Sequence, residues 1–213
     1  VYVHLSSNYD IGAISNTATY GAETFETRSV SIREGSTSNA AGVAQLERTS
    51  FPTRDFPNTD VRQTAFFIQN ESVLLSQRLR LTLGARHDDF EANAMGDLVY
   101  FSGNPGTPLP ADFEDSETTL SASVVYQLTD SISSFLRYSE GFRAPPYDDV
   151  NVGFTNPIGG YKTISNPNLE SETSEGIEVG LRWNNESVNV GVSVYQNDYE
   201  NFIESLSLAP GFL

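Results

Sequence analysis

The sequence predicts an all-β protein: an antiparallel, up-and-down segment of a transmembrane β-barrel, with about eight strands of a larger barrel. Three observations lead to this prediction. Apolar and polar residues alternate with a period of two, tight turns alternate with long polar connections, and no run of about 18 apolar residues could form a transmembrane helix. Short turns at one end and long loops at the other are typical of outer-membrane barrels.

The expected strands follow the alternating runs along the chain. In the run that begins at Leu79, for example, every second residue is apolar and the residues between are Arg80, Thr82 and Gly84. Such alternation produces a strand with one apolar and one polar face. We expect strands at residues 1–8, 15–33, 60–75, 79–92, 116–128, 132–143, 172–184 and 187–203. Many exceed the usual soluble strand of about 5–6 residues, which favours strands that cross a bilayer.

The alternation also predicts which side chains face lipid. A charge at the lipid midplane costs about 2–4 kcal/mol, so the apolar face must be the outer one. We expect these apolar residues to face lipid: Leu79, Leu81, Leu83, Ile177, Val179, Leu181, Val188, Val190 and Val192. We expect these polar residues to face the lumen: Arg80, Glu178, Arg182 and Asn189.

The connections have two lengths. Tight turns are expected at residues 76–78, 129–131 and 184–185, where Asn, Asp and Ser suit hairpins. Long connections rich in Gly, Pro, Ser and Asn occupy residues 34–59, 93–115 and 144–171. Aromatic residues gather near the expected strand ends, as the girdles of membrane barrels require: Tyr138, Phe142, Trp183, Tyr195, Tyr199 and Phe202.

Charge excludes some functions. The net charge is −16, and no Lys or Arg lies between Arg86 and Arg137, although nine acidic residues do. Such a surface repels phosphate, so we expect no nucleic-acid partner, and we interpret the acidic run as a solvated loop. The sequence has no cysteine, which excludes disulfides and thiol nucleophiles.

No motif indicates an enzyme or a metal centre. Nucleophile elbows, metalloprotease motifs and phosphate-binding loops are absent, so we expect no catalytic residues. His4 and His87 have no second histidine at ligand spacing, so we expect no metal site and interpret both as structural or exposed.

Two short blocks flank the last long connection. Phe142, Arg143, Ala144 and Pro145 form the first; Asn166, Pro167, Asn168 and Leu169 form the second. Prolines lack the N–H that a strand ladder needs, so Pro145 and Pro146 end one strand and Pro167 holds an extended turn before the next. We expect Arg143 to pair with a loop acid, Asp148 or Asp149.

In their order and spacing, these blocks resemble those of TonB-dependent outer-membrane receptors of the haem/haemoglobin branch. The resemblance implies active uptake of an iron-containing ligand across the outer membrane of a Gram-negative bacterium, with energy delivered through TonB. It implies these partners: outer-membrane lipid, the TonB complex (through an N-terminal region outside this sequence), and haem, a haem protein or a ferric chelate. We expect no resident cofactor, haem being a transported ligand.

The resemblance also bears on domain organisation. Relatives have an N-terminal plug and a larger barrel, so we expect residues 1–213 to be part of one barrel domain, without the plug. Two alternatives stay open at the level of sequence. One is a passive outer-membrane porin, which an upstream plug would exclude, and the other is a soluble all-β binding module.

The loop between the two blocks departs from the pattern of these relatives. The resemblance implies a haem-coordinating histidine there, yet residues 146–165 contain none. Tyrosine is an axial haem ligand in some proteins, so Tyr147 and Tyr161 are the candidate iron ligands. We expect the intact receptor to take ferric haem through one of these tyrosines, or to serve another iron chelate.

Overall fold

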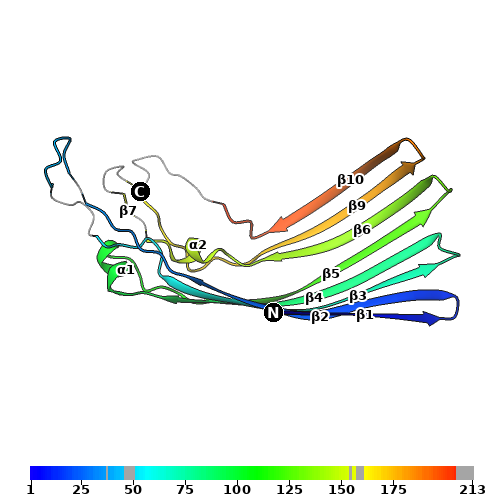
Figure 1. The fold of residues 1–213 in the computed structure, drawn as a ribbon, viewed down its shortest axis with the longest axis horizontal. Coiled ribbons are helices and arrows are strands. Elements are labelled where there is room, and N and C mark those ends of the chain that lie inside the picture. Colours follow the sequence, from blue (N-terminus) through cyan, green and yellow to red (C-terminus); the bar gives the residue numbers. More distant parts are fainter. Residues whose placement is uncertain (37, 46–50, 154, 157–160, 205–213) are drawn as a thin grey trace.

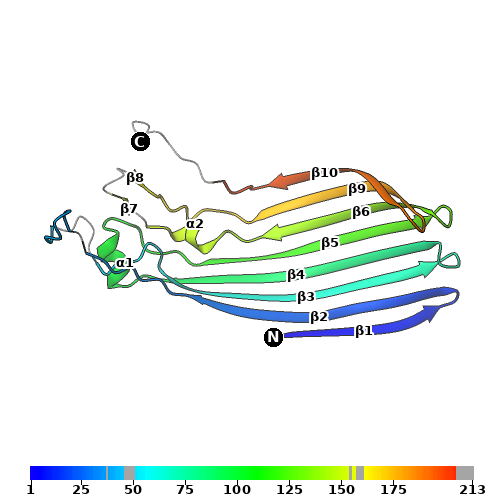
Figure 2. The ribbon, with the colours of Figure 1, turned by 45° about the horizontal axis from the view of Figure 1, so that its top comes forward.

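The computed structural model describes residues 1–36, 38–45, 51–153, 155–156 and 161–204, without the side chains at 155–156 and 161–162. Its main element is a curved, eight-stranded sheet in the order β1-β2-β3-β4-β5-β6-β9-β10 (Figures 1 and 2). The strands are β1 (Tyr2–Ile11), β2 (Ile14–Ser29), β3 (Asn58–Leu74), β4 (Leu79–Met95), β5 (Phe113–Gln127), β6 (Ile132–Arg143), β9 (Glu172–Asn184) and β10 (Asn189–Glu200).

Neighbouring strands all pair in antiparallel fashion, and β1 and β10 form the two edges of the sheet. The predicted up-and-down meander is therefore confirmed. The predicted bounds of β6 and β9 match, whereas β1 continues to Ile11 rather than ending near residue 8. It continues because Gly12, with φ of +63°, adopts the left-handed conformation that closes a tight hairpin into β2.

Three short elements lie in the long connections and were not predicted. They are the helices α1 (Leu98–Gly103) and α2 (Tyr147–Asn151), and a small hairpin of β7 (Thr155–Asn156) with β8 (Tyr161–Lys162). Helices of six and five residues are too short to display a helical period in the sequence. In the part of the chain that the structure describes, no helix is long and apolar enough to span a membrane.

The register gives the sheet an apolar and a polar face. Directly opposed residues in adjacent strands share a face. One cross-strand row consists of Leu81, Val124, Leu136, Val179 and Val194. The next row, one residue along, points to the other face and consists of Thr82, Ser123, Arg137, Glu178 and Tyr195. Tyr195 therefore lies on the polar face, so its predicted place in a lipid-facing aromatic girdle was wrong.

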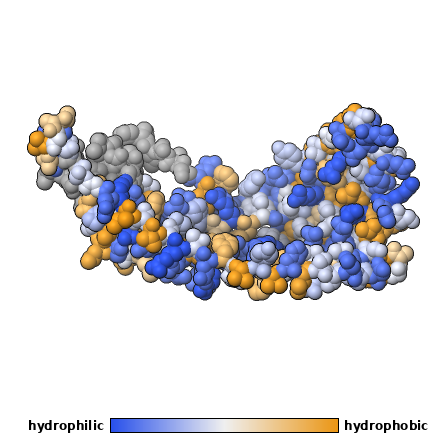
Figure 3. Space-filling view, in the orientation of Figure 1, coloured by the Kyte–Doolittle hydropathy of each residue, from blue (hydrophilic) through white to orange (hydrophobic). Residues whose placement is uncertain are grey.

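The predicted apolar and polar sets lie on opposite faces, with one exception. Val188 precedes β10 and belongs to the β9–β10 turn, so it is not a strand residue. Among the described residues, no second sheet packs on the apolar face, and side chains such as Val179 and Val192 are exposed by 55% and 65%. Figure 3 shows hydrophobic residues at the molecular surface, interspersed with hydrophilic ones. The soluble sandwich is therefore wrong, because its apolar face would have to be covered.

The acidic run between Arg86 and Arg137 is not a solvated loop, which corrects our interpretation. Asp88, Asp89 and Glu91 belong to β4, and Glu114, Asp115 and Glu117 belong to β5. Two further acids cap backbone groups: Asp97 accepts from Tyr100 N–H at 2.9 Å and Asp112 accepts from Ala94 N–H at 2.8 Å.

Candidate ligand-binding site

The described parts of the long connections lie at one end of the sheet (Figures 1 and 2). We call the described residues of 30–57, 96–112 and 144–171 the loop unit. The largest fully buried side chains of the described chain are Tyr100, Val150, Thr53, Thr59 and Pro145, and all except Thr59 lie in this unit. Most of the large buried side chains therefore lie among the loops rather than on the sheet.

Hydrogen bonds join the loops of this unit. The Tyr100 hydroxyl donates to the Asn151 carbonyl at 3.0 Å, and burial raises the pKa of Tyr100. The Asn151 side chain bonds both the N–H and the carbonyl of Ala111, each at 2.8 Å. The Asn104 amide donates to the Arg54 carbonyl at 2.7 Å. Since these bonds run from 96–112 to both other connections, the three form one folded unit.

Ion pairs reinforce the same contacts. Arg54, with its side chain only 7% exposed, lies 3.0 Å from Asp97, which caps α1. Gly153 N–H donates to the Asp55 carbonyl at 2.8 Å. Burial raises the pKa of Asp55, and Arg33, 3.1 Å away, partly opposes that shift.

The first block ends β6, and its arginine closes the base of the last loop. Arg143 lies 2.9 Å from Glu172, the first residue of β9, and not within ion-pair distance of Asp148 or Asp149, so the predicted partners were wrong. The reason is register: Arg143 and Glu172 are directly opposed across the β6–β9 pair. Sequence reasoning missed Glu172 because it lies 29 residues away.

The residues around Arg143 have different environments. Phe142 is half-buried in β6, Ala144 is half-buried, and Pro145 is fully buried. Pro146 precedes α2, whose first turn carries Asp148 and Asp149. Burial and the neighbouring Asp148 raise the pKa of Asp149, and Arg143 opposes that shift.

The second block contacts α2 through its backbone. Asn166 N–H donates to the Asp149 carbonyl at 3.3 Å, and its side-chain oxygen accepts from Asn168 N–H at 3.1 Å. Asn166, Pro167 and Asn168 are exposed, whereas Leu169 is half-buried. The structure thus brings the two blocks together through α2 and Glu172, with three residues of the second block facing solvent.

The two candidate iron ligands differ in what the structure describes. Tyr147 begins α2, and its hydroxyl lies 2.8 Å from the Ser29 hydroxyl at the end of β2. This bond ties the last loop to a strand 118 residues away. Tyr161 lies in β8, paired with Asn156, and its side chain falls outside the described residues.

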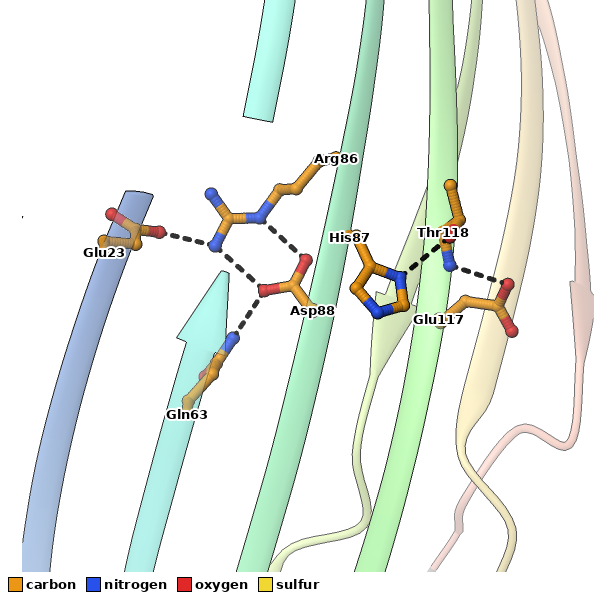
Figure 4. Close-up of polar contacts among 7 residues, drawn as sticks. All are labelled: Glu23, Gln63, Arg86, His87, Asp88, Glu117 and Thr118. Atoms are coloured by element: carbon orange, nitrogen blue, oxygen red, sulfur yellow. Dashed lines mark hydrogen bonds and ion pairs between the residues drawn. The ribbon is translucent and has the colours of Figure 1, made fainter. Parts of the chain in front are cut away.

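The polar face carries an ionic network that connects three strands. The Arg86 guanidinium lies 2.5 Å from Glu23 and 2.7 Å from Asp88, and Gln63 donates to Asp88 at 2.9 Å (Figure 4). Arg86 reaches from β4 to β2, across β3. The neighbouring His87 points to the other face, 2.9 Å from the Thr118 hydroxyl.

A family model described as TonB dependent receptor-like, beta-barrel, matches residues 2–213. The chain belongs to the TonB-dependent receptor family. It is therefore a segment of an up-and-down receptor barrel, and its family consists of transport receptors rather than enzymes. The family also separates the chain from passive porins.

Several curated proteins are similar in sequence to this family member. A hemin receptor of Yersinia enterocolitica is 28% identical over 66% of this chain and 20% of its own length. A hemoglobin-haptoglobin utilization protein B of Neisseria meningitidis is 28% identical over 61% of this chain and 16% of its own. The chain therefore spans a fifth or less of these relatives.

Solved structures of TonB-dependent receptors share the fold. The hemophore receptor HasR of Serratia marcescens has a TM-score of 0.69 at 14% identity, over 93% of this chain and 32% of its own. The ferric-catecholate import receptor Fiu of Escherichia coli has a TM-score of 0.61 at 16% identity, over 96% of this chain and 31% of its own. At these identities the likeness concerns the fold alone.

Proposed function

We propose that this chain is part of an outer-membrane active-transport receptor of a Gram-negative bacterium that takes up haem or another iron chelate, with energy coupled through TonB. Residues 1–213 then form part of one barrel domain. The apolar face contacts outer-membrane lipid and the polar face lines the lumen, because charges are disfavoured against lipid. The TonB complex contacts a region outside this sequence.

The observation that carries the proposal is the single folded unit made by the long loops. Loops held by their own buried core, as by Tyr100 and Asn151, present a pre-formed surface, which lowers the entropy lost when a ligand binds. The related proteins are named as hemin and hemoglobin-haptoglobin receptors or utilization proteins, which supports haem or a haem protein as the ligand class. The proposed ligand-proximal residues are Phe142, Arg143, Ala144, Pro145, Tyr147, Tyr161, Asn166, Pro167, Asn168 and Leu169.

A non-haem ferric chelate is a second candidate, favoured by the missing histidine in residues 146–165. Neutral imidazole coordinates haem iron directly, whereas a tyrosine must ionise first. Tyr147 would also have to release Ser29. Iron bound through Tyr147 therefore requires a local rearrangement of the loop against β2.

Titration of the intact, purified receptor with haemin tests the proposal. A shift of the Soret band that is lost in Tyr147→Phe or Tyr161→Phe supports haem bound through that tyrosine. Tyr20→Phe, on the apolar face of β2, is the control. Tight binding that survives both loop substitutions removes the tyrosine ligand. An unchanged Soret band, together with binding of a ferric chelate, favours the second candidate.

A further inference from the structure

A polar grid lies on the polar face where β6, β9 and β10 run side by side. Two adjacent rows on this face cross the three strands, one of Arg137, Glu178 and Tyr195 and the other of Ser139, Gly176 and Asn197. A cavity of about 270 Å³ opens over these residues, and Ile177 completes its lining. We call this cavity the grid pocket. It is separate from the loop unit.

The hollow depends on Gly176. A Cβ atom at this position would lie 2.6 Å from the Asn197 side-chain oxygen and 3.6 Å from the Ser139 hydroxyl. The first distance is shorter than real Cβ contacts, so any larger residue would displace the Asn197 amide and fill the centre of the grid. A glycine in the interior of a strand weakens that strand. Here the absence of a side chain at Gly176 leaves the centre of the grid open.

Four polar side chains around the hollow have no hydrogen-bond or ion-pair partner in the part of the chain that the structure describes. Across the described residues, the side chains of Arg137, Glu178, Tyr195 and Asn197 make no hydrogen bond or ion pair. The Arg86 network on the same face is the opposite case, because its groups are bonded to one another. Arg137 is exposed on this face, so its guanidinium is accessible to a ligand.

We propose that the grid pocket is a carboxylate-binding subsite for the transported ligand. The Arg137 guanidinium offers a planar fork that matches a carboxylate, and the Asn197 amide and Tyr195 hydroxyl offer further donors. Glu178 lies in the centre of its row and offsets the charge of Arg137, so the pocket suits one singly charged carboxylate arm rather than a doubly charged phosphate.

This inference rests on the proposed function, since it names the part of the iron-containing ligand that the barrel wall recognises. The intact receptor in detergent is titrated with haemin and with haemin dimethyl ester, in which both carboxylates are blocked. We expect Arg137→Gln to weaken haemin binding by roughly tenfold, the effect of losing one charged hydrogen bond. Binding of the ester should stay unchanged, because its blocked carboxylates make no such bond.

Gly176→Ala is expected to weaken haemin binding similarly, because it fills the hollow. Gly191→Ala is the matched control: this glycine lies on the same face of β10, and its Cβ would have no contact closer than 3.9 Å. Ferric citrate, a hydroxycarboxylate chelate, is the second probe and is expected to respond to both substitutions as haemin does.

The outcomes separate the two proposals. Equal binding of haemin and its ester by every variant overturns the subsite and leaves the proposed function intact. A loss in Arg137→Gln that is equal for acid and ester reveals a structural role for Arg137 and also overturns the subsite. Failure of the unsubstituted receptor to bind haemin, haemoglobin and every member of a panel of ferric chelates contradicts the proposed function itself.

Discussion

The backbone N–H of Leu120 donates to the Glu140 carboxylate at 2.8 Å, at the point where β5 and β6 stop pairing. The ladder between these strands runs only from the Gln127–Ser133 pair to the Ser121–Ser139 pair. Beyond it, β5 pairs only with β4 and β6 only with β9. Carboxylates replace the missing carbonyls: Thr118 N–H donates to Glu117 at 3.0 Å and Ser116 N–H to Asp115 at 2.8 Å.

We call the stretch of β5 before Ser121, which does not pair with β6, the open seam. It predicts a break in hydrogen-exchange protection within β5. We expect the amides of Ser116, Thr118 and Leu120 to exchange faster than those of Ala122 and Val124, because side chains protect an N–H less well than a ladder does. Glu140→Leu should speed exchange at Leu120 about fivefold, corresponding to about 1 kcal/mol for one lost hydrogen bond. Uniform protection along β5 in the intact receptor would contradict the seam.

The Arg143–Glu172 pair predicts unequal effects of its two single substitutions. Glu172 is 9% exposed and also accepts from Ile203 N–H at 2.7 Å, whereas Arg143 is 61% exposed. We therefore expect Glu172→Ala to cost more free energy of unfolding than Arg143→Ala. A double-mutant cycle on the intact receptor should give a coupling of about 0.2–1 kcal/mol, the range of exposed ion pairs. Strict additivity would show that the pair contributes nothing.

The bond from Tyr100 to Asn151 predicts that the loops unfold together. Tyr100→Phe keeps the buried ring and removes only the hydroxyl, so we expect a loss of about 1 kcal/mol in loop stability. The measurement is limited proteolysis or hydrogen exchange at residues 104–111 and 150–153. Ser102→Ala, in the same helix but with an exposed hydrogen bond, is the control and should have little effect. Faster exchange confined to residues 98–103 would mean that the loops are independent.

The sequence predicted the sheet well and the loop unit poorly, for physical reasons. Alternation imposes a period of two on long strands, so β6 and β9 were predicted to the residue. Buried polar residues such as Asn104 and Asn151 look in sequence like solvated loop residues, because only their hydrogen bonds distinguish them. The partner of Arg143 and the grid pocket depend on which strands become neighbours, and no local pattern contains that information.

The raised pKa of Asp149 predicts a pH-dependent loop. Burial, with the nearby charge of Asp148, disfavours the ionised form, so the folded loop binds this proton more tightly than the unfolded chain does. The ionised carboxylate thus destabilises the loop above the folded pKa, and acidification through that pKa removes the penalty. We expect Asp149→Asn to slow hydrogen exchange in residues 147–153 at pH 7 and to have a smaller effect near pH 4. An equal effect at both pH values would exclude titration of Asp149 as the cause.

Leu81 and Thr82 are neighbours in β4 that lie on opposite faces of the sheet, so we expect an arginine at each position to change stability by different amounts. Leu81 belongs to the apolar row with Val124, whereas Thr82 opposes Ser123 on the polar face. If the apolar face contacts lipid, Leu81→Arg should lower the free energy of unfolding in vesicles by about 2–4 kcal/mol near the midplane and less toward the interface. Thr82→Arg should change it little, because an arginine there lies on the polar face beside Glu71, its neighbour in β3. Denaturant titration of the intact receptor in lipid vesicles measures both. Equal losses in the two variants would show that the faces do not differ in environment, and a larger loss for Thr82→Arg would reverse the orientation of the sheet.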